Sequence, residues 1–268
     1  MQIAPLIHSR TLYCDFNINF AVRPSDLDVN WAMNKVLQST LDIDILNGVR
    51  LLTAHNGKIG IAGIACNFKS FIENYVPDAI NDAEKYFRDE RGREIKVFLG
   101  YVFKGNGVPN VSYKYLWQMF KENLAPQWEF KVAETVIVPY KNCDTKNIGG
   151  KISPVESTGG IDFYNNTDAE KLFAQCINEH KNFCSNVDQY KIISSGEFNA
   201  IATSKGNIDR FKSEQAQEKT PPQTSTTGTQ RQPTARPIPP QAESRNGNMG
   251  LIIGAAAVIL AMIIFLIK

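Results

Sequence analysis

Residues 49–66 read VRLLTAHNGKIGIAGIAC, and this stretch predicts a β-hairpin. The two apolar runs at 49–54 and 58–66 favour extended backbone. Asn56-Gly57 lies between them and supplies the positive backbone angles that a tight turn needs. Glycines at 60 and 63 match no phosphate-binding loop, and they are expected to allow close packing within the second strand.

Strand and helix patterns alternate on both sides of this hairpin. Residues 11–22 are predicted as a strand, because apolar side chains recur at every second position. A helix is then expected to begin after Pro24, with Ser25 as its N-cap and Asp26 and Asp28 in its first turn. The other predicted helices are 79–91, 112–123 and 167–183. The other predicted strands are 95–103, 135–139 and 161–164, with a second hairpin at 190–194 and 197–203.

This alternation predicts an α/β or α+β body with a mixed sheet. An α/β region at 1–142 is followed by a smaller β-α-β-β region at 143–212, and the two belong to one domain or to two. A linker at 213–248 and an apolar tail at 249–268 complete the predicted organisation.

The C-terminal residues 250–268 read GLIIGAAAVILAMIIFLIK, and residues 250–267 carry no charge. Eighteen helical residues span roughly 27 Å, close to the hydrocarbon thickness of a bilayer. Core helices rarely run this long without a polar side chain. The segment is therefore predicted as a single-pass transmembrane helix that anchors the chain by its C-terminal tail and contacts the lipid bilayer through residues 250–267.

Small residues recur at intervals of three or four along this predicted membrane helix. Gly250 and Gly254 form a Gly-x-x-x-Gly pattern, and Ala257 and Ala261 extend it. Small side chains let two helices pack closely in lipid. One hypothesis is that the anchor self-associates through these residues. The other is that the pattern has no role, because small residues are common in membrane helices.

The linker at 213–248 has no aromatic residue and contains six prolines. Such a composition buries too little apolar surface to offset the entropy of ordering, which predicts disorder. Arg236, Pro237, Pro239 and Pro240 lie in a run that favours polyproline II, so they form either a docking peptide or, as we favour, part of a plain spacer.

Charge places the body relative to the membrane and limits its partners. Three arginines precede the tail within about twenty residues, and only Lys268 follows it, so the bulk of the chain is predicted to be cytosolic. Residues 1–212 hold 24 basic and 24 acidic side chains, which gives no electrostatic basis for expecting nucleic acid. The five cysteines form no regular framework, and reduced thiols are expected.

Cys176, His180 and Cys184 are spaced by four on the helix predicted at 167–183. This spacing stacks side chains on one face, as in helical zinc sites. However, Cys176 and Cys184 would lie about 12 Å apart along such a helix, too far to share one metal ion. We therefore predict no metal site, with Cys176 and His180 as weak candidates, and we favour a buried apolar stripe.

Aromatic residues are concentrated between 113 and 130, among them Tyr113, Tyr115, Trp117, Phe120 and Trp128. A recognition surface is one interpretation of this density, but packing against the sheet is the interpretation that we favour.

These patterns contain no legible catalytic constellation and predict no cofactor. The leading hypothesis is a tail-anchored membrane protein whose cytosolic α/β body acts as a protein-binding adaptor, sensor or effector, with a protein partner at the membrane. The alternative is a membrane-tethered enzyme acting on a nucleotide or peptide substrate, so enzymatic activity is left open and a non-enzymatic role is favoured.

Overall fold

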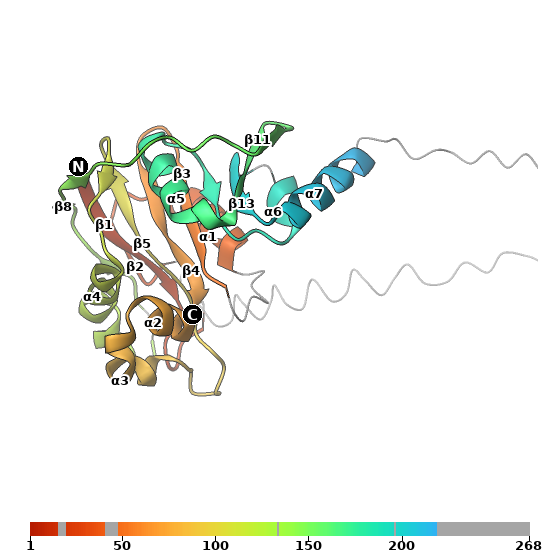
Figure 1. Ribbon diagram of the computed structural model, residues 1–268. Coiled ribbons are helices and arrows are strands. Elements are labelled where there is room, and N and C mark those ends of the chain that lie inside the picture. The colour runs from red at the N-terminus through yellow and green to blue at the C-terminus, as the bar shows by residue number, and fades with distance from the viewer. Residues whose placement is uncertain (16–19, 41–47, 133, 196, 219–268) are drawn as a thin grey trace, which may run out of the picture. The chain divides into compact units, whose positions relative to one another are not determined.

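The structure is a computed structural model that describes residues 1–15, 20–40, 48–132, 134–195 and 197–218 (Figure 1). The strands are β1 (Gln2–Ser9), β2 (Val22–Arg23), β3 (Arg50–His55), β4 (Gly60–Asn67), β5 (Lys96–Lys104), β6 (Val108–Pro109), β7 (Val136–Ile137), β8 (Lys141–Asn142), β9 (Thr145–Lys146), β10 (Glu156–Thr158), β11 (Ile161–Asn165), β12 (Phe183–Cys184) and β13 (Ala200–Thr203). The helices are α1 (Val29–Thr40), α2 (Phe68–Tyr75), α3 (Ile80–Ala83), α4 (Tyr113–Asn123), α5 (Ala169–Asn178), α6 (Tyr190–Ser194) and α7 (Lys205–Glu218). Short 3₁₀ turns are Pro77–Ala79, Glu84–Tyr86, Ala125–Gln127 and Asn166–Asp168.

Within the described residues, eleven strands form one mixed sheet. Its order from edge to edge is β10-β11-β13-β12-β3-β4-β5-β1-β2-β7, and β8 pairs with β1 beside this path. The central strands β3, β4, β5 and β1 pair antiparallel, whereas β13 is parallel to both β11 and β12. A separate pair, β6 and β9, lies outside this sheet. The predicted α/β body with a mixed sheet is confirmed.

The hairpin predicted at 49–66 is confirmed as β3 and β4, with His55 opposite Gly60. Its turn runs over four residues, in which Gly57 has a φ of +89°. The Asn56 side chain accepts hydrogen bonds from the N–H groups of Lys58 and Ile59, at 3.1 and 3.0 Å. The turn therefore uses both properties of the Asn-Gly pair, an accepting side chain and a permissive backbone.

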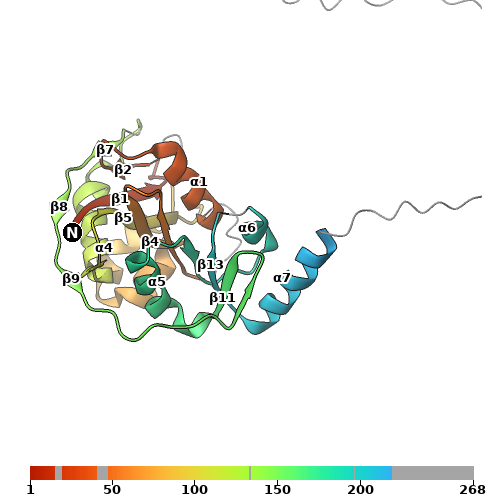
Figure 2. The same ribbon diagram turned by 90° about the horizontal axis from the view of Figure 1, so that it is seen from above.

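The central strands are buried on both faces of the sheet. Alternate side chains of β5 enter two apolar clusters, with Leu99 in one and Phe98 in the other. We call the first side the α5 face, since α2, α4 and α5 pack there, and the second the α1 face, since α1, α6 and α7 pack there. Figure 2 shows α1 and α5 on opposite sides of the central strands. Burial on both faces explains why β5 has no charged residue between its terminal lysines, Lys96 and Lys104.

Gly63 and Gly100 face each other in the β4–β5 ladder. A Cβ atom on Gly63 would lie 2.5 Å from the carbonyl oxygen of Leu99, and one on Gly100 would lie 2.4 Å from that of Ala62. These distances leave no room for a side chain, so the expectation of close packing at Gly63 is confirmed.

The N-terminal part of the chain differs from the prediction. The long N-terminal strand is β1, and residues 11–15 form an irregular bend rather than part of a strand at 11–22. The helix expected after Ser25 begins at Val29, and the Asp28 carboxylate accepts the N–H of Trp31 at 3.0 Å. Asp28 therefore caps this helix in place of Ser25.

Three predicted elements are shorter than expected or of another type. The helix expected at 79–91 is broken into short turns that end at Tyr86. The helix expected at 167–183 ends at Asn178, and β12 follows it. The stretch Tyr190–Ser194, predicted as one arm of a hairpin, is the helix α6. Periodicity cannot separate a short buried strand from a short buried helix, which explains this last error.

Helix α7 continues to Glu218, six residues beyond the body boundary predicted at 212. Strands from both predicted body regions belong to the same sheet, and Met1–Pro221 forms one compact unit. Among the helices of the described residues, none is long and apolar enough to cross a bilayer. The predicted anchor at 249–268 and nearly all of the predicted linker lie outside the described residues.

Candidate ligand-binding site

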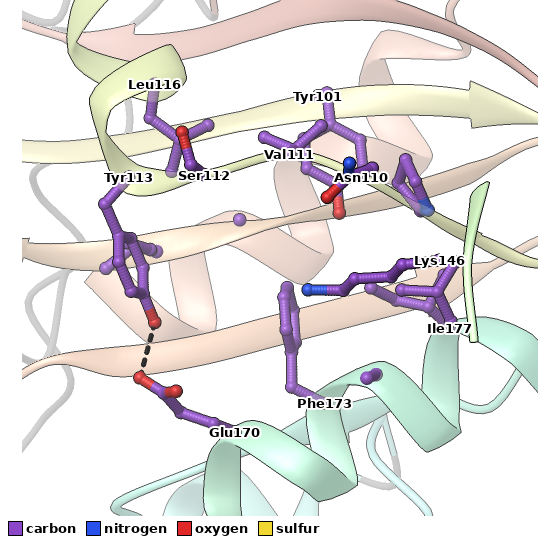
Figure 3. Close-up of a pocket in the computed structure, with 15 residues that line it drawn as sticks. Tyr101, Asn110, Val111, Ser112, Tyr113, Leu116, Lys146, Glu170, Phe173 and Ile177 are labelled. Carbon is purple, nitrogen blue, oxygen red and sulfur yellow. Dashed lines mark hydrogen bonds between the residues drawn. The ribbon is translucent and has the colours of Figure 1, made fainter. Parts of the chain in front are cut away.

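A pocket of about 320 Å³ lies on the α5 face of the sheet, and we call it the α5 pocket. Its floor includes Ile64 of β4 and Tyr101 of β5, and its walls come from α4, α5 and the β6–β9 pair (Figure 3). The other residues that line it are Gly63, Val108, Pro109, Asn110, Val111, Ser112, Tyr113, Leu116, Lys146, Glu170, Phe173, Ala174 and Ile177.

Local sequence rules explain how the walls are positioned. Ser112 is the N-cap of α4, and its Oγ accepts the N–H of Tyr115 at 3.2 Å. The segment before it is tied to the loop between β8 and β9, because Asn110 N–H donates to the carbonyl of Asp144 at 2.8 Å. The cap that starts α4 therefore also places Tyr113 at the pocket wall.

A hydrogen bond joins α4 and α5 across the pocket. The Tyr113 hydroxyl donates to Glu170 Oε1 at 2.7 Å (Figure 3). Burial raises the pKa of Tyr113, and the hydrogen bond and charge of Glu170 raise it further. The pKa of Tyr101, on the floor, is also raised by burial. Both phenols therefore keep their protons at neutral pH.

Lys146 brings a positive charge to the other side of the pocket. Figure 3 shows its side chain extending into the pocket beside Phe173. Within the part of the chain that the structure describes, no carboxylate forms a salt bridge with the Lys146 ammonium. The pocket thus combines an apolar floor, one lysine with no ion-pair partner among the described residues and one carboxylate that already accepts a hydrogen bond.

A second hollow of about 390 Å³ adjoins this pocket and shares Lys146, Glu170 and Ala174 with it. Its outer wall is the segment around Gly149 and Gly150. The buried Gln175 holds this segment to α5, since its Oε1 accepts the N–H of Ile152 at 2.9 Å. The two hollows therefore run side by side along α5.

Several large apolar side chains are exposed on the N-terminal loop after β1 and on the segment from Phe130 to β7. Tyr13, Phe130, Val132 and Ile137 are 42%, 56%, 71% and 51% exposed, and we call them the apolar edge. The segments that carry Tyr13 and Phe130 run together, because Leu12 N–H donates to the Trp128 carbonyl and Cys14 Sγ lies 3.4 Å from the Phe130 oxygen. Ile137 belongs to β7, the last strand on the sheet path.

The structure separates the three residues of the Cys-His-Cys spacing. Cys176 is buried on α5 within the cluster of the α5 face, whereas Cys184 is buried in β12 within the cluster of the α1 face. Burial raises the pKa of each thiol to about 12. His180 lies beyond the end of α5 with a φ of +54°. Among the described residues, no group of three or more metal-ligating side chains is found.

His180 instead stacks on His55, with ring centroids 4.0 Å apart and an interplanar angle of 1°. Burial lowers the pKa of His55, and the charge of His180 lowers it further. His55 Nδ1 accepts the N–H of Gly57 at 3.0 Å, whereas the buried His180 Nε2 has no hydrogen-bond partner in the described part of the chain. Both effects favour the neutral form of His55.

The predicted aromatic packing is confirmed for Trp117, Phe120 and Trp128, which are buried on the α5 face. Tyr115 is 36% exposed, and Tyr113 lines the α5 pocket. The residues proposed for membrane-helix packing (Gly250, Gly254, Ala257, Ala261) and for a docking peptide (Arg236, Pro237, Pro239, Pro240) lie outside the described residues.

Sequence reasoning missed most of the α5 pocket. Tyr113 drew attention as part of an aromatic cluster, but Lys146 and Glu170 carry no local signal, since lysine and glutamate are common on exposed surfaces. Comparisons with protein-family models, with curated proteins and with solved structures find no match. The chain is therefore an α/β protein with a mixed sheet and, on the α5 face of that sheet, a pocket large enough for a small ligand.

Proposed function

We propose that this chain is a tail-anchored, single-pass membrane protein whose cytosolic α/β body is an adaptor that binds a protein partner at the membrane. The apolar edge is the observation that carries the binding part of the proposal. Its four large side chains stay in water in the free chain, where covering them would be favourable.

The chemistry around the apolar edge resembles that of a protein interface. Exposed charged residues (Glu129, Lys131 and Glu134) border its apolar side chains. Interfaces commonly combine an apolar centre with a polar rim, and aromatic residues such as Phe130 are enriched at that centre. This pattern favours a protein partner over a nucleic acid, in agreement with the balanced charge of the body.

The membrane part of the proposal rests on the sequence of residues 250–267, which are uncharged and long enough for one bilayer crossing. The arginines before this segment favour a cytosolic body. Tethering raises the effective concentration of the body near other membrane proteins, so a modest interface suffices for function.

The alternative, a membrane-tethered enzyme, receives less support from the geometry. Neither His55 nor His180 lines the α5 pocket or the hollow beside it. Burial raises the pKa of the thiols of Cys66, Cys176 and Cys184, which disfavours a thiolate nucleophile at these positions.

Two measurements test the proposal. Full-length chain should resist carbonate extraction from membranes, whereas a chain ending at Glu218 should be extracted, because α7 ends there. A photo-crosslinking residue in place of Val132 should then give adducts with a defined neighbour in cells. Val155 is a matched control position, since it is 57% exposed and lies outside the apolar edge. Extraction of the full-length chain would refute the anchor, and equal adducts at both positions would refute the binding surface.

A further inference from the structure

Two groups of opposite charge line the α5 pocket, and they differ in whether a residue of the protein already binds them. The Glu170 carboxylate already accepts the Tyr113 hydroxyl, while the Lys146 ammonium has no salt-bridge partner among the described residues. A hydrogen bond between an ammonium and a negatively charged partner is roughly twice as strong as one between neutral groups. A ligand that complements the Lys146 ammonium is therefore an anion.

We infer that the α5 pocket binds a small organic acid, with its acidic group at Lys146 and its apolar body against the floor of the pocket. This would make the body a ligand sensor as well as an adaptor. The inference does not depend on the tail anchor or on the apolar edge, so it stands or fails separately from the proposed function.

Two other polar residues of the pocket, Ser112 beside Tyr113 and Asn110, also favour an acidic ligand. The Ser112 Oγ uses a lone pair to accept the Tyr115 N–H, which leaves its hydroxyl proton for a ligand. Asn110 also lines the pocket and carries an amide N–H₂ group. A carboxylate can accept hydrogen bonds from several such donors at once.

The walls of the pocket favour an apolar body on that acid. Its lining residues include Ile64, Leu116, Phe173 and Ile177, which offer aliphatic and aromatic surface. Its volume of about 320 Å³ is at the lower end of the range for small-molecule sites, roughly 300–1,000 Å³. A compact aryl or branched alkyl acid therefore fits this pocket better than a long lipid.

Three probes with the same apolar body and different head groups test the inference. We would titrate full-length protein in lipid nanodiscs with 4-phenylbutyrate, with its neutral amide and with 4-phenylbutylamine, using calorimetry and empty nanodiscs as the blank. The acid should bind most tightly. Equal affinities for acid and amide, tighter binding of the amine, or no binding of the acid would each overturn the inference.

Charge variants locate the binding. Lys146→Met should weaken binding of 4-phenylbutyrate about tenfold, since a charge-assisted hydrogen bond is lost. Lys171→Met is the matched control, because Lys171 is also exposed but lines only the adjoining hollow, and it should leave the affinity unchanged. Glu170→Gln should strengthen binding of the acid, because it removes a negative charge and keeps an acceptor for Tyr113. Equal effects of the two lysine variants, or weaker binding in Glu170→Gln, would overturn the assignment.

Discussion

Replacement of Asp89 by asparagine would test whether one buried carboxylate holds the loop before β5. The Asp89 side chain is 2% exposed. Its Oδ1 accepts the backbone N–H groups of Arg91 and Arg93 at 3.0 and 2.9 Å. Its Oδ2 accepts Arg93 Nε at 2.6 Å and Arg10 Nη1 at 3.4 Å. Asp89 therefore connects this loop to the end of β1.

The expected loss in the free energy of unfolding depends on which hydrogen bonds of Asp89 an asparagine can keep. Its single carbonyl oxygen can accept the two backbone N–H groups, but its N–H₂ group would then face Arg93 Nε, donor against donor. One hydrogen bond between charged groups is worth about 1.5–3 kcal/mol, and Arg93 Nη1 keeps its bond to Asp15 Oδ2 at 3.0 Å. We therefore expect Asp89→Asn to lower the free energy of unfolding by about 1.5–3 kcal/mol at pH 7.

The pH dependence gives the prediction a second signature. Burial alone would raise the pKa of Asp89, but hydrogen bonds from Arg93 and Arg91 outweigh it, so the pKa lies below the usual value of 3.8. A carboxyl whose pKa is lowered by folding contributes stability above its unfolded pKa, and that stability is lost as the pH falls through the folded pKa. The difference between wild type and Asp89→Asn should therefore be full at pH 7 and shrink below about pH 4.

Urea unfolding of the full-length chain in mild detergent, followed by tryptophan fluorescence, measures both effects, because Trp117 and Trp128 are buried. Asp78→Asn is the matched control. Its salt bridge with Lys114 at 3.3 Å joins side chains that are 81% and 73% exposed, so a change of less than about 0.5 kcal/mol is expected. A loss below 1 kcal/mol for Asp89→Asn, or an equal loss at pH 7 and pH 3, would refute the reasoning.

Two further predictions concern the core and the histidine pair. Phe120→Ala should lower the free energy of unfolding by about 3–5 kcal/mol, because Phe120 is fully buried and its ring centroid lies 4.6 Å from that of Phe68. The control is Tyr115→Ala, on the exposed side of the same helix, which should lower it by less than about 1 kcal/mol. The same urea assay measures both variants. Because folding lowers the pKa of His55, the folded state binds fewer protons than the unfolded one, so stability should fall as the pH drops below about 6.5. A His55→Asn variant should show a shallower fall between pH 7 and pH 5, and identical slopes would contradict this account.

Sequence patterns predicted the centre of this fold better than its edges. The β3–β4 hairpin has a turn whose chemistry is local, so Asn56-Gly57 was sufficient to place it. Ser112 likewise marked the start of α4, because an N-cap acts on N–H groups only two or three residues away. In contrast, β1 contains Pro5 and has no clear alternation, and pairing with β5 over eight residues is what makes it a strand.

The α5 pocket lay beyond sequence reasoning for the same physical reason. Lys146 and Glu170 are brought to one pocket by β9 and α5, which are connected through two separate strands. Their proximity depends on tertiary packing and leaves no spacing pattern in the chain. The Cys176–Cys184 spacing shows the opposite case, a regular local pattern that the fold divides between the two faces of the sheet.

The placement of the cysteines makes the unmodified chain a ready subject for spectroscopy. Cys14, Cys66, Cys176 and Cys184 are buried, and Cys143 is the partly exposed thiol of the five. A maleimide dye or nitroxide should therefore attach first at Cys143, between β8 and β9 and close in sequence to Lys146. A single reporter at that position would follow movements of the β6–β9 wall by fluorescence or electron paramagnetic resonance, with every native residue left in place.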